Sequence, residues 1–392
     1  MRLREIHIKG FKSIVDQTIA FGRVNCFIGA NGTGKSNVLE AIGVLSAAAA
    51  GRVDDEAIIR RGVRAGLPRV FKTSFSGIPI PPHIHLEATG EPDATFRVSL
   101  LNPLDAPEPA WSFKTEFLAS GATEIVTRGP RGKKALNLDE TAGLAALKRV
   151  DLEPGDPASM LLKALQGYAI YSPNTPAMRA TVPDPQMRAP VGLVGGGLAE
   201  GFAALKRTLD EEGLDDVLGL IDWVGDVSVT EAAGNLLSPA VSRAKHVLKF
   251  ADRFMAPSRN TLTAYDASEG ALYVLFAAIL CLSPSSPAFF AIDNLDSALN
   301  PRLVTRLVTR LADWLRLANP DRQLLFTAHN PSVLDGLDLD DDEVRLFAVE
   351  RNSDGHTVVR RIEVSESLRT LNAEYPLSRL WAMGHLGAVP NV

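Results

Sequence analysis

The eight residues Gly29–Ser36 have the types and spacing of a phosphate-binding loop. They read GANGTGKS and fit the pattern G-x-x-x-x-G-K-[ST] at every fixed position, with an apolar stretch before and helical periodicity after. Glycines let successive backbone N–H groups turn inward around phosphates. Lys35 would supply a charge for the β- and γ-phosphates, and the Ser36 hydroxyl can ligate Mg²⁺. The segment therefore predicts a site for ATP and Mg²⁺.

A phosphate-binding loop needs an acid to complete its metal site, and Asp293 is the candidate. It directly follows the short apolar run 288–292, so it lies at the carboxyl end of an expected buried strand. Ligands bind at that edge of open α/β sheets. We therefore expect Ser36 and Asp293 to be the two metal ligands. The residues alone also allow Asp293 to cap the next turn, and that alternative stays open.

Apolar periodicity divides much of the chain into alternating strands and helices. Strand patterns occur at 1–9, 24–28, 288–292 and 323–327, and residues 68–101 alternate as in a meander. Helical patterns occur at 36–50, 268–282 and 301–317. From about 136 to 250 the pattern is mainly helical, with breaks at prolines and glycines. Strands separated by helices of this length predict an α/β fold with a mostly parallel sheet.

Composition excludes several classes of protein. The 392 residues are 46% hydrophobic and 22% charged, with a net charge of −5, so there is no overall basic field for nucleic acid. Both cysteines, Cys26 and Cys281, lie in apolar runs and are expected to be buried thiols in a reducing compartment. The longest apolar run, 271–282, is shorter than the ~20 residues that span a bilayer. We therefore expect a cytoplasmic protein without a membrane segment.

Six short motifs follow one another along the chain: Lys9–Ser13, Gly29–Asn37, Tyr265–Gly270, Ala288–Asp293, Asp296–Pro301 and Thr327–His329. In this order they resemble the GFKS turn, Walker A, a degenerate signature, Walker B, the D-loop and the H-switch of the ABC-type ATPase heads of the SMC/RecF group. The resemblance is strongest to the stand-alone ATPases related to the OLD family and found in prokaryotic phage defence. Residues 172–179 and 196–199 are similar to less specific features of the same relatives.

The resemblance implies an ABC-type P-loop ATPase head with a mostly parallel core sheet, antiparallel strands and an inserted helical lobe. Its domains would be an N-terminal ATPase lobe at 1–110, a mainly helical lobe at 111–250 and a C-terminal ATPase lobe at 251–392. Two copies would clamp two ATP molecules, so that the homodimer has composite sites.

The resemblance also implies a set of site residues. The nucleotide-binding residues would be Lys12, Asn31, Gly32, Thr33, Gly34, Lys35, Ser36 and Asn37 of one copy with Ser268 and Gly270 of the other. The catalytic residues would be Lys35, Asp293, Asn294 and His329. Two alternatives remain. Ser268 would also fit a plain helix N-cap, and His329 would also fit a structural histidine.

The chain departs from this group directly after Asp293. The usual residue there is a Glu that polarises the attacking water, and here it is Asn294. An amide can hydrogen-bond a water but cannot act as a base, which typically lowers the rate by about 10²–10⁴. The sequence thus predicts tight ATP binding and slow hydrolysis. Asp296, two residues on, is a conceivable substitute for the base.

The region after His329 differs from that of the OLD nucleases. Those carry a TOPRIM domain, whereas only 63 residues follow His329 here, and the acidic run 338–343 has the character of a solvated loop. We therefore expect no intrinsic nuclease. The resulting hypothesis is a nucleotide-gated switch, the ATPase or sensor component of an antiphage system whose effector is a separate protein.

Basic residues leave a second hypothesis open, an ATP-dependent DNA clamp of the RecF/SMC kind. Arg302, Arg306 and Arg310 lie on one helix face, which is either solvated or a partner surface. Two further clusters are Arg243, Lys245, His246, Lys249 and Arg253, and Arg128, Arg131, Lys133 and Lys134. Such patches bind DNA mainly through phosphates. No aromatic interleaving or groove-reading module accompanies them.

Overall fold

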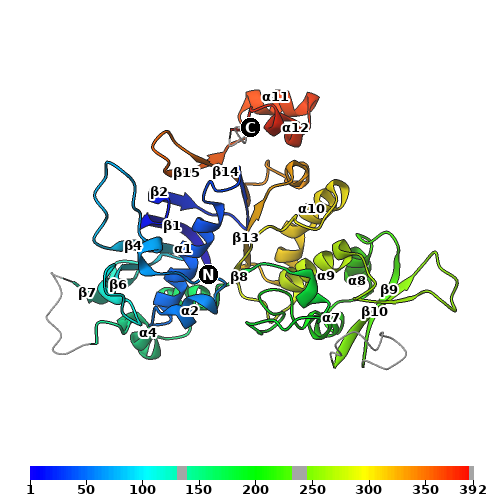
Figure 1. The fold of residues 1–392 in the computed structure, drawn as a ribbon, viewed down its shortest axis with the longest axis horizontal. Helices are drawn as coiled ribbons and strands as arrows, with labels where there is room; N and C mark the ends of the chain where they lie inside the picture. The colour runs from blue at the N-terminus through cyan, green and yellow to red at the C-terminus, as the bar shows by residue number, and fades with distance from the viewer. Residues whose placement is uncertain (130–138, 232–244, 388–392) are drawn as a thin grey trace.

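A computed structural model describes residues 1–129, 139–231 and 245–387. Within these ranges the chain forms two six-stranded sheets and one three-stranded sheet (Figure 1). The first, largely parallel, has the order β15-β14-β3-β13-β12-β8. Its strands are β3 (Val24–Ile28), β8 (Ile170–Tyr171), β12 (Phe289–Ile292), β13 (Gln323–Ala328), β14 (Val344–Arg351) and β15 (Thr357–Ile362). Only the β14–β15 pair is antiparallel.

The second sheet is antiparallel throughout and has the order β2-β1-β4-β5-β6-β7. Its strands are β1 (Arg2–Phe11), β2 (Ile14–Ala20), β4 (Ile84–Glu91), β5 (Ala94–Leu101), β6 (Ser112–Ser120) and β7 (Thr123–Arg128). Alternate residues of β4 and β5 are buried, as expected for a sheet with one face on the core. The small sheet contains β9 (Val224–Glu231), β10 (His246–Asp252) and β11 (Thr261–Thr263).

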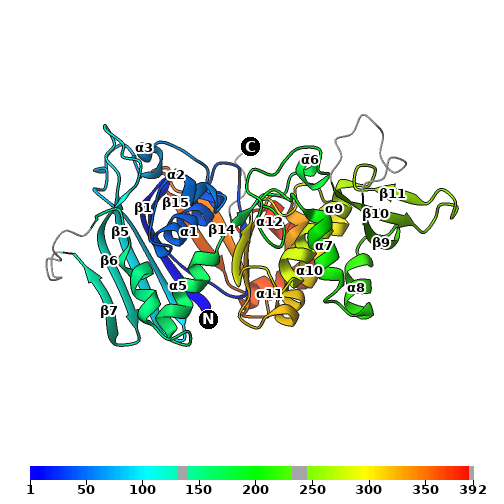
Figure 2. The same ribbon diagram turned by 90° about the horizontal axis from the view of Figure 1, so that it is seen from below.

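Helices cover both faces of the parallel sheet (Figure 2). On the side of the antiparallel sheet lie α1 (Lys35–Ala49) and α5 (Pro157–Gly167); on the other side lie α7 (Leu198–Lys206), α8 (Glu211–Leu218), α9 (Glu269–Leu282) and α10 (Pro301–Ala318). The shorter helices are α2 (Asp55–Ile59), α3 (Pro68–Phe71), α4 (Leu144–Lys148), α6 (Thr175–Met178), α11 (Glu366–Glu374) and α12 (Leu377–Ala382). Two 3₁₀ turns occupy Arg149–Asp151 and Pro331–Gly336.

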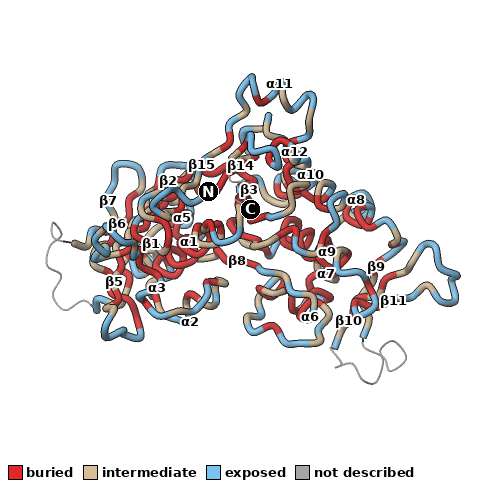
Figure 3. The backbone as a smooth tube through the Cα atoms, turned by 45° about the horizontal axis from the view of Figure 1, so that its top comes forward, coloured by how far each residue is buried: buried red, intermediate tan, exposed pale blue. Residues whose placement is uncertain are grey.

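The parallel sheet separates two hydrophobic cores. In β3 the side chains alternate between them, because Cys26 and Ile28 belong to the core around α9 while Phe27 belongs to the core around α1. Every residue of α9 from Ala271 to Leu282 is buried, which explains why this helix is apolar on all sides. Figure 3 shows the buried positions concentrated along α1, β3 and α9. Because β3 packs against a core on each face, the point where it ends, and the loop that follows, are held in place.

The α/β fold with parallel and antiparallel strands is confirmed, but the expectation of one helical lobe at 111–250 is wrong as a description of its packing. The alternating residues of β6 and β7 extend the antiparallel sheet. β8 joins the parallel sheet beside β12, and β9 and β10 form a sheet of their own. The domain boundaries stay a prediction.

Two findings concern the expectations from composition. In the described ranges, no helix combines the length and apolar character needed to cross a bilayer. Cys26 and Cys281 are both buried free thiols, as expected. Four basic residues named above, Arg131, Lys133, Lys134 and Arg243, fall outside the described residues.

Candidate functional site

The candidate site begins where β3 ends and the loop Gly29–Gly34 leads into α1. Gly34 takes a left-handed conformation, with φ 109°, immediately before the helix. In the described structure no side chain caps α1, and its first turn has no acidic residue. Its N-terminal N–H groups and the positive end of the helix therefore face the loop, as anion binding requires. Asn31 and Gly32 are exposed at the tip.

The β14–β15 hairpin holds this loop from the side. Thr357 donates a hydrogen bond of 2.6 Å from its hydroxyl to the carbonyl of Thr33, and Arg351 donates one of 3.0 Å from Nε to the carbonyl of Gly32. A Cβ on Gly34 would lie 2.2 Å from Oγ1 of Thr357, so only glycine fits there. Sequence reasoning missed both Thr357 and Arg351, because no local pattern marks a contact across more than 300 residues.

The two predicted metal ligands face each other across the sheet edge. Ser36 Oγ lies 3.0 Å from Oδ2 of Asp293, which follows β12. Thr327, at the end of β13, donates its hydroxyl proton to Asp293 and accepts a hydrogen bond of 2.8 Å from the backbone N–H of Asn294. Thr327 was named only as part of a motif, and the structure adds this role as an anchor for the carboxylate.

This pair of oxygen donors fits Mg²⁺ carried by a nucleotide. Mg²⁺ is usually held by one or two protein oxygens together with phosphates and waters. The described residues contain no group of three or more His, Cys, Asp or Glu side chains that could hold a metal without phosphates. Ser36 and Asp293 are thus suited to a metal that arrives with ATP, and Asp293 does more than cap a turn.

Lys35, His329 and Asn294 form a chain of contacts beside the metal ligands. Lys35 Nζ donates to the carbonyls of Gly29 at 2.7 Å and Ala30 at 3.0 Å, and it lies 3.5 Å from Nδ1 of His329. Nε2 of His329 lies 3.0 Å from Oδ1 of Asn294. The structure therefore brings all four predicted catalytic residues together.

Burial shifts both bases of this chain toward their neutral forms. Burial lowers the pKa of Lys35 to about 8, against the opposing attraction of Asp293 and Asp296. Burial and the nearby Lys35 charge lower the pKa of His329 below its ordinary value.

Asp296 supports the histidine segment and is buried, with 6% of its surface exposed. Its Oδ2 accepts hydrogen bonds from the backbone N–H groups of His329, at 2.9 Å, and of Asn330. Its Oδ1 has no hydrogen-bond partner among the described residues. Through Oδ2, Asp296 therefore positions the segment that begins at His329, and its role as a substitute base stays a prediction.

Two predicted nucleotide-binding side chains are engaged within the protein. Lys12 pairs with the buried carboxylate of Glu40 and lies 4.9 Å from the centre of the Phe71 ring. Asn37 donates a hydrogen bond of 2.6 Å to the hydroxyl of Ser13. Both side chains tie the GFKS turn to α1. Their predicted contact with the nucleotide stays a prediction.

Ser268 and Gly270 lie at the start of α9, on the opposite face of the parallel sheet from α1 (Figure 2). Ser268 is the N-cap of α9, and its hydroxyl accepts a hydrogen bond of 3.4 Å from the N–H of Ala271. It also lines a pocket of about 190 Å³ together with Asn300 and Arg302. Within one chain, Ser268 and Gly270 are therefore separated from the phosphate loop by the sheet, and their predicted contact with a nucleotide stays a prediction.

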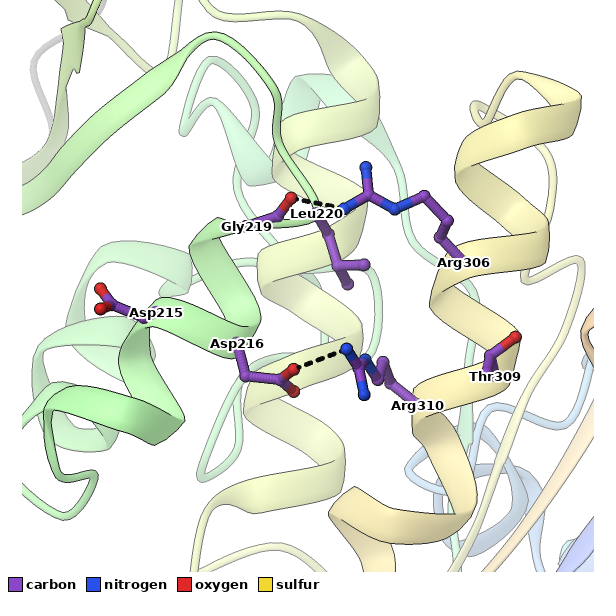
Figure 4. Close-up of a pocket in the computed structure, with 7 residues that line it drawn as sticks. All are labelled: Asp215, Asp216, Gly219, Leu220, Arg306, Thr309 and Arg310. Atoms are coloured by element: carbon purple, nitrogen blue, oxygen red, sulfur yellow. Dashed lines mark hydrogen bonds and ion pairs between the residues drawn. The ribbon is translucent and has the colours of Figure 1, made fainter.

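Arg306 and Arg310 contact the segment around α8 within the same chain (Figure 4). Arg306 lies 3.0 Å from a carboxylate oxygen of Asp222 and donates to the carbonyl of Gly219 at 2.7 Å. Arg310 lies 3.2 Å from Asp216. These contacts line a pocket of about 340 Å³. Both arginine side chains stay exposed beside these contacts, at 42% and 48%, so a solvated face agrees with the structure and a partner surface stays a prediction.

The other charged segments are also partly engaged. His246 lies 2.9 Å from Glu200, and Arg253 donates to the carbonyl of Val224 at 2.7 Å. Arg128 donates to the carbonyl of Ala142 at 2.7 Å. The acidic run 338–343 lies before β14, and four of its members, Asp340, Asp341, Asp342 and Glu343, pair with arginines.

Comparison with known proteins agrees with this geometry. A family model described as "AAA ATPase domain" matches residues 1–62, and one described as "AAA domain, putative AbiEii toxin, Type IV TA system" matches residues 226–335. The first match contains the phosphate loop and the second contains Asp293 and His329. A search of curated proteins found no match.

Solved structures similar to this chain are heads of SMC proteins. The "SmcHead bound to the C-winged helix domain of ScpA" has a TM-score of 0.54 and 13% identity, covering 94% of this chain and 100% of that one. The Smc head domain bound to the C-terminal domain of ScpA, from Pyrococcus furiosus, has a TM-score of 0.50 and 13% identity, covering 95% and 99%. The SMC head domain from Thermotoga maritima has a TM-score of 0.49 and 16% identity, covering 93% of this chain and 100% of that one.

At these identities the likeness establishes the fold, which is that of an SMC head. Together with the two AAA matches, it supports an ATPase of the AAA and SMC-head type.

Proposed function

We propose that this chain is a slowly hydrolysing ATPase that dimerises around Mg²⁺–ATP and works as a nucleotide-gated switch. One observation carries the proposal: Lys35, Ser36 and Asp293 converge on one sheet edge while Asn294, in the place of a base, is hydrogen-bonded to His329. Three groups thus suit binding of the triphosphate and its metal, and the fourth suits holding a water without taking its proton.

The residues would divide the work as follows. The N–H groups at the start of α1 and the Lys35 ammonium would bind the phosphates. Ser36 and Asp293 would hold Mg²⁺, which supplies charge neutralisation at the β- and γ-phosphates. His329 would contact the γ-phosphate and link its presence to Asp296 and the segment that follows β13.

Dimerisation is proposed because the site of one chain is incomplete. Ser268 caps α9 on the far face of the sheet, so its hydroxyl and the helix N-terminus could reach a γ-phosphate only from a second copy. Two such contacts related by a two-fold axis would close two sites at once, which is the common symmetry of soluble homodimers.

The biological setting is a further part of the proposal. We infer that the chain is the ATPase or sensor component of a prokaryotic antiphage system that acts with a separate effector. The family model over residues 226–335 is described by a toxin of a type IV toxin–antitoxin system, which is a two-component arrangement. Two SMC heads of the same fold were solved with a domain of a second protein, ScpA, bound to them. Their complexes support the proposal that this chain also binds a separate protein.

A DNA clamp of the RecF/SMC kind is the second candidate function. The specific observation in its favour is the fold shared with SMC heads, together with the basic residues Lys245 and Lys249 at β10. Binding of DNA that requires ATP and weakens steeply with salt would favour it. A stable complex with a separate effector protein, without DNA, would favour the switch.

Light scattering with and without Mg²⁺–ATP, alongside phosphate release, tests the main proposal. We expect a shift from monomer to dimer with ATP and phosphate release close to background. Asp293→Ala should abolish the shift, because it removes a metal ligand. Turnover of several per second in the unaltered protein, lost in Asp293→Ala, would show that the base lies elsewhere and that the switch reading is wrong.

A further inference from the structure

The order of strands in the parallel sheet indicates on which side of β3 the two ends of a bound nucleotide would lie. Asp293 and His329, which would face the metal and the γ-phosphate, follow β12 and β13 on one side of β3. On the other side of β3 lie β14 and β15. A triphosphate that crosses the loop after β3 from the Asp293 side would then extend its nucleoside toward the β14–β15 hairpin.

An aromatic pair lies at the tip of that hairpin. The rings of Phe75 and His356 have their centroids 4.6 Å apart, at an angle of 55°. Phe75 belongs to the segment between α3 and β4, and both residues are half-buried, so part of each ring is open to solvent. The blue segment before β4 and the orange hairpin approach each other in Figure 1.

Short contacts fix this pair relative to the phosphate loop. His356 is flanked by Gly355, whose carbonyl accepts a hydrogen bond of 2.8 Å from Arg351, the residue that also binds Gly32. The next residue, Thr357, binds the loop at the carbonyl of Thr33. The segment of Phe75 is tied to β2 by a hydrogen bond of 3.1 Å from Thr73 to the carbonyl of Ile14.

We propose that Phe75 and His356 form a shelf on which the base of the bound nucleotide stacks. This inference rests on the proposed ATP-binding function and names the specificity-determining residues of the same site. Aromatic rings accept any base through its flat face, and purines offer the larger face. The shelf would therefore favour a purine nucleoside triphosphate over the bare triphosphate, while the phosphate loop binds both.

Calorimetric titration of the full chain with Mg²⁺–ATP and with Mg²⁺–tripolyphosphate tests the shelf. In Phe75→Ala and in His356→Ala, the Kd for ATP should rise about tenfold, because stacking on an aromatic ring is lost. The Kd for tripolyphosphate should stay unchanged. Phe75→Trp should keep the preference for ATP. Phe254→Ala, which removes a ring that is 77% exposed, serves as the matched control and should change neither Kd.

The outcomes separate the shelf from the function on which it rests. Equal weakening of ATP and tripolyphosphate in Phe75→Ala would mean that the ring only supports the loop, and it would overturn the shelf. An unchanged Kd for ATP in both variants would also overturn the shelf. In that case, if Lys35→Ala binds neither ATP nor tripolyphosphate, the proposed phosphate site still stands. If the unaltered chain binds neither ligand, the proposed function fails together with the shelf.

Discussion

Nε2 of His329 lies 3.0 Å from Oδ1 of Asn294, while Nδ1 of the same ring lies 3.5 Å from the Lys35 ammonium. A lysine ammonium only donates, so Nδ1 accepts and Nε2 carries the proton that it donates to Asn294. The pKa of His329 is lowered by burial and by Lys35, which agrees with a neutral ring. The amide oxygen is thus occupied, and Asn294 presents an N–H group to any water.

Restoring a carboxylate at this position should speed up hydrolysis. We expect Asn294→Glu to raise phosphate release by about 10²-fold, because a carboxylate beside the γ-phosphate can take the proton of the attacking water. Asn294→Gln lengthens the side chain equally without adding a base and should stay near background. A steady-state phosphate assay compares the two. Equal rates in the two variants would contradict the assignment of position 294 as the place of the missing base.

A charge at Ser268 should block dimerisation without unfolding α9. Aspartate and asparagine both cap helices well, so Ser268→Asp and Ser268→Asn keep the N-cap. The aspartate would repel the γ-phosphate of the opposing copy. We expect light scattering to show an ATP-dependent dimer for Ser268→Asn and a monomer for Ser268→Asp, with the same Kd for ATP in the monomer. Dimerisation of both variants would remove Ser268 from the interface.

ATP binding should weaken as the pH rises above 8. Burial lowers the pKa of Lys35 to about 8 in the free protein, and bound phosphates would raise it. Binding then takes up a proton, so the Kd should increase roughly 30-fold between pH 7 and pH 9.5. Lys35→Arg, whose guanidinium stays protonated, should give a flat profile in the same titration. A flat profile in the unaltered protein would contradict a partly neutral Lys35.

The stability of the protein should depend strongly on Asp184, a buried acid that holds the loop around Gly196. Asp184 accepts hydrogen bonds from the backbone N–H groups of Gln186, at 2.8 Å, and of Val194 and Gly196, both at 3.0 Å. Asp184→Ala leaves these donors unsatisfied, and we expect a loss of about 3 kcal/mol in the free energy of unfolding by urea. Asp222→Ala, which breaks the exposed pair with Arg306, should cost less than about 1 kcal/mol. Similar losses in both variants would contradict this ranking.

Parts of the fold and of the candidate site could be predicted where they depend on a contiguous pattern of residues. The phosphate loop and the run before Asp293 are contiguous, so their place at the sheet edge followed from hydrophobic periodicity and a fixed motif. His329 could be placed for the same reason, since it directly follows a buried strand, β13.

The parts that were missed depend on pairing between distant segments. Arg351 and Thr357 contact the loop across 319 and 324 residues, and no pattern around them indicates that partner. β6 pairs with β5 across the boundary expected at 110, and hydrophobic periodicity does not indicate which strands pair. The bonds of Lys12 to Glu40 and of Asn37 to Ser13 also require the fold, since a motif states residue types but not what a side chain meets.

The position of β3 between β13 and β14 has a consequence for how the protein is made. Its phosphate loop emerges from the ribosome 257 residues before Asp293, and both neighbours of β3 are made later still. At about 5–20 residues per second, the delay between Ser36 and Asp293 is roughly 13–50 s. Until synthesis has passed β14, both edges of this apolar strand lack the strands that pair with them in the fold, and an unpaired apolar edge is a site of aggregation.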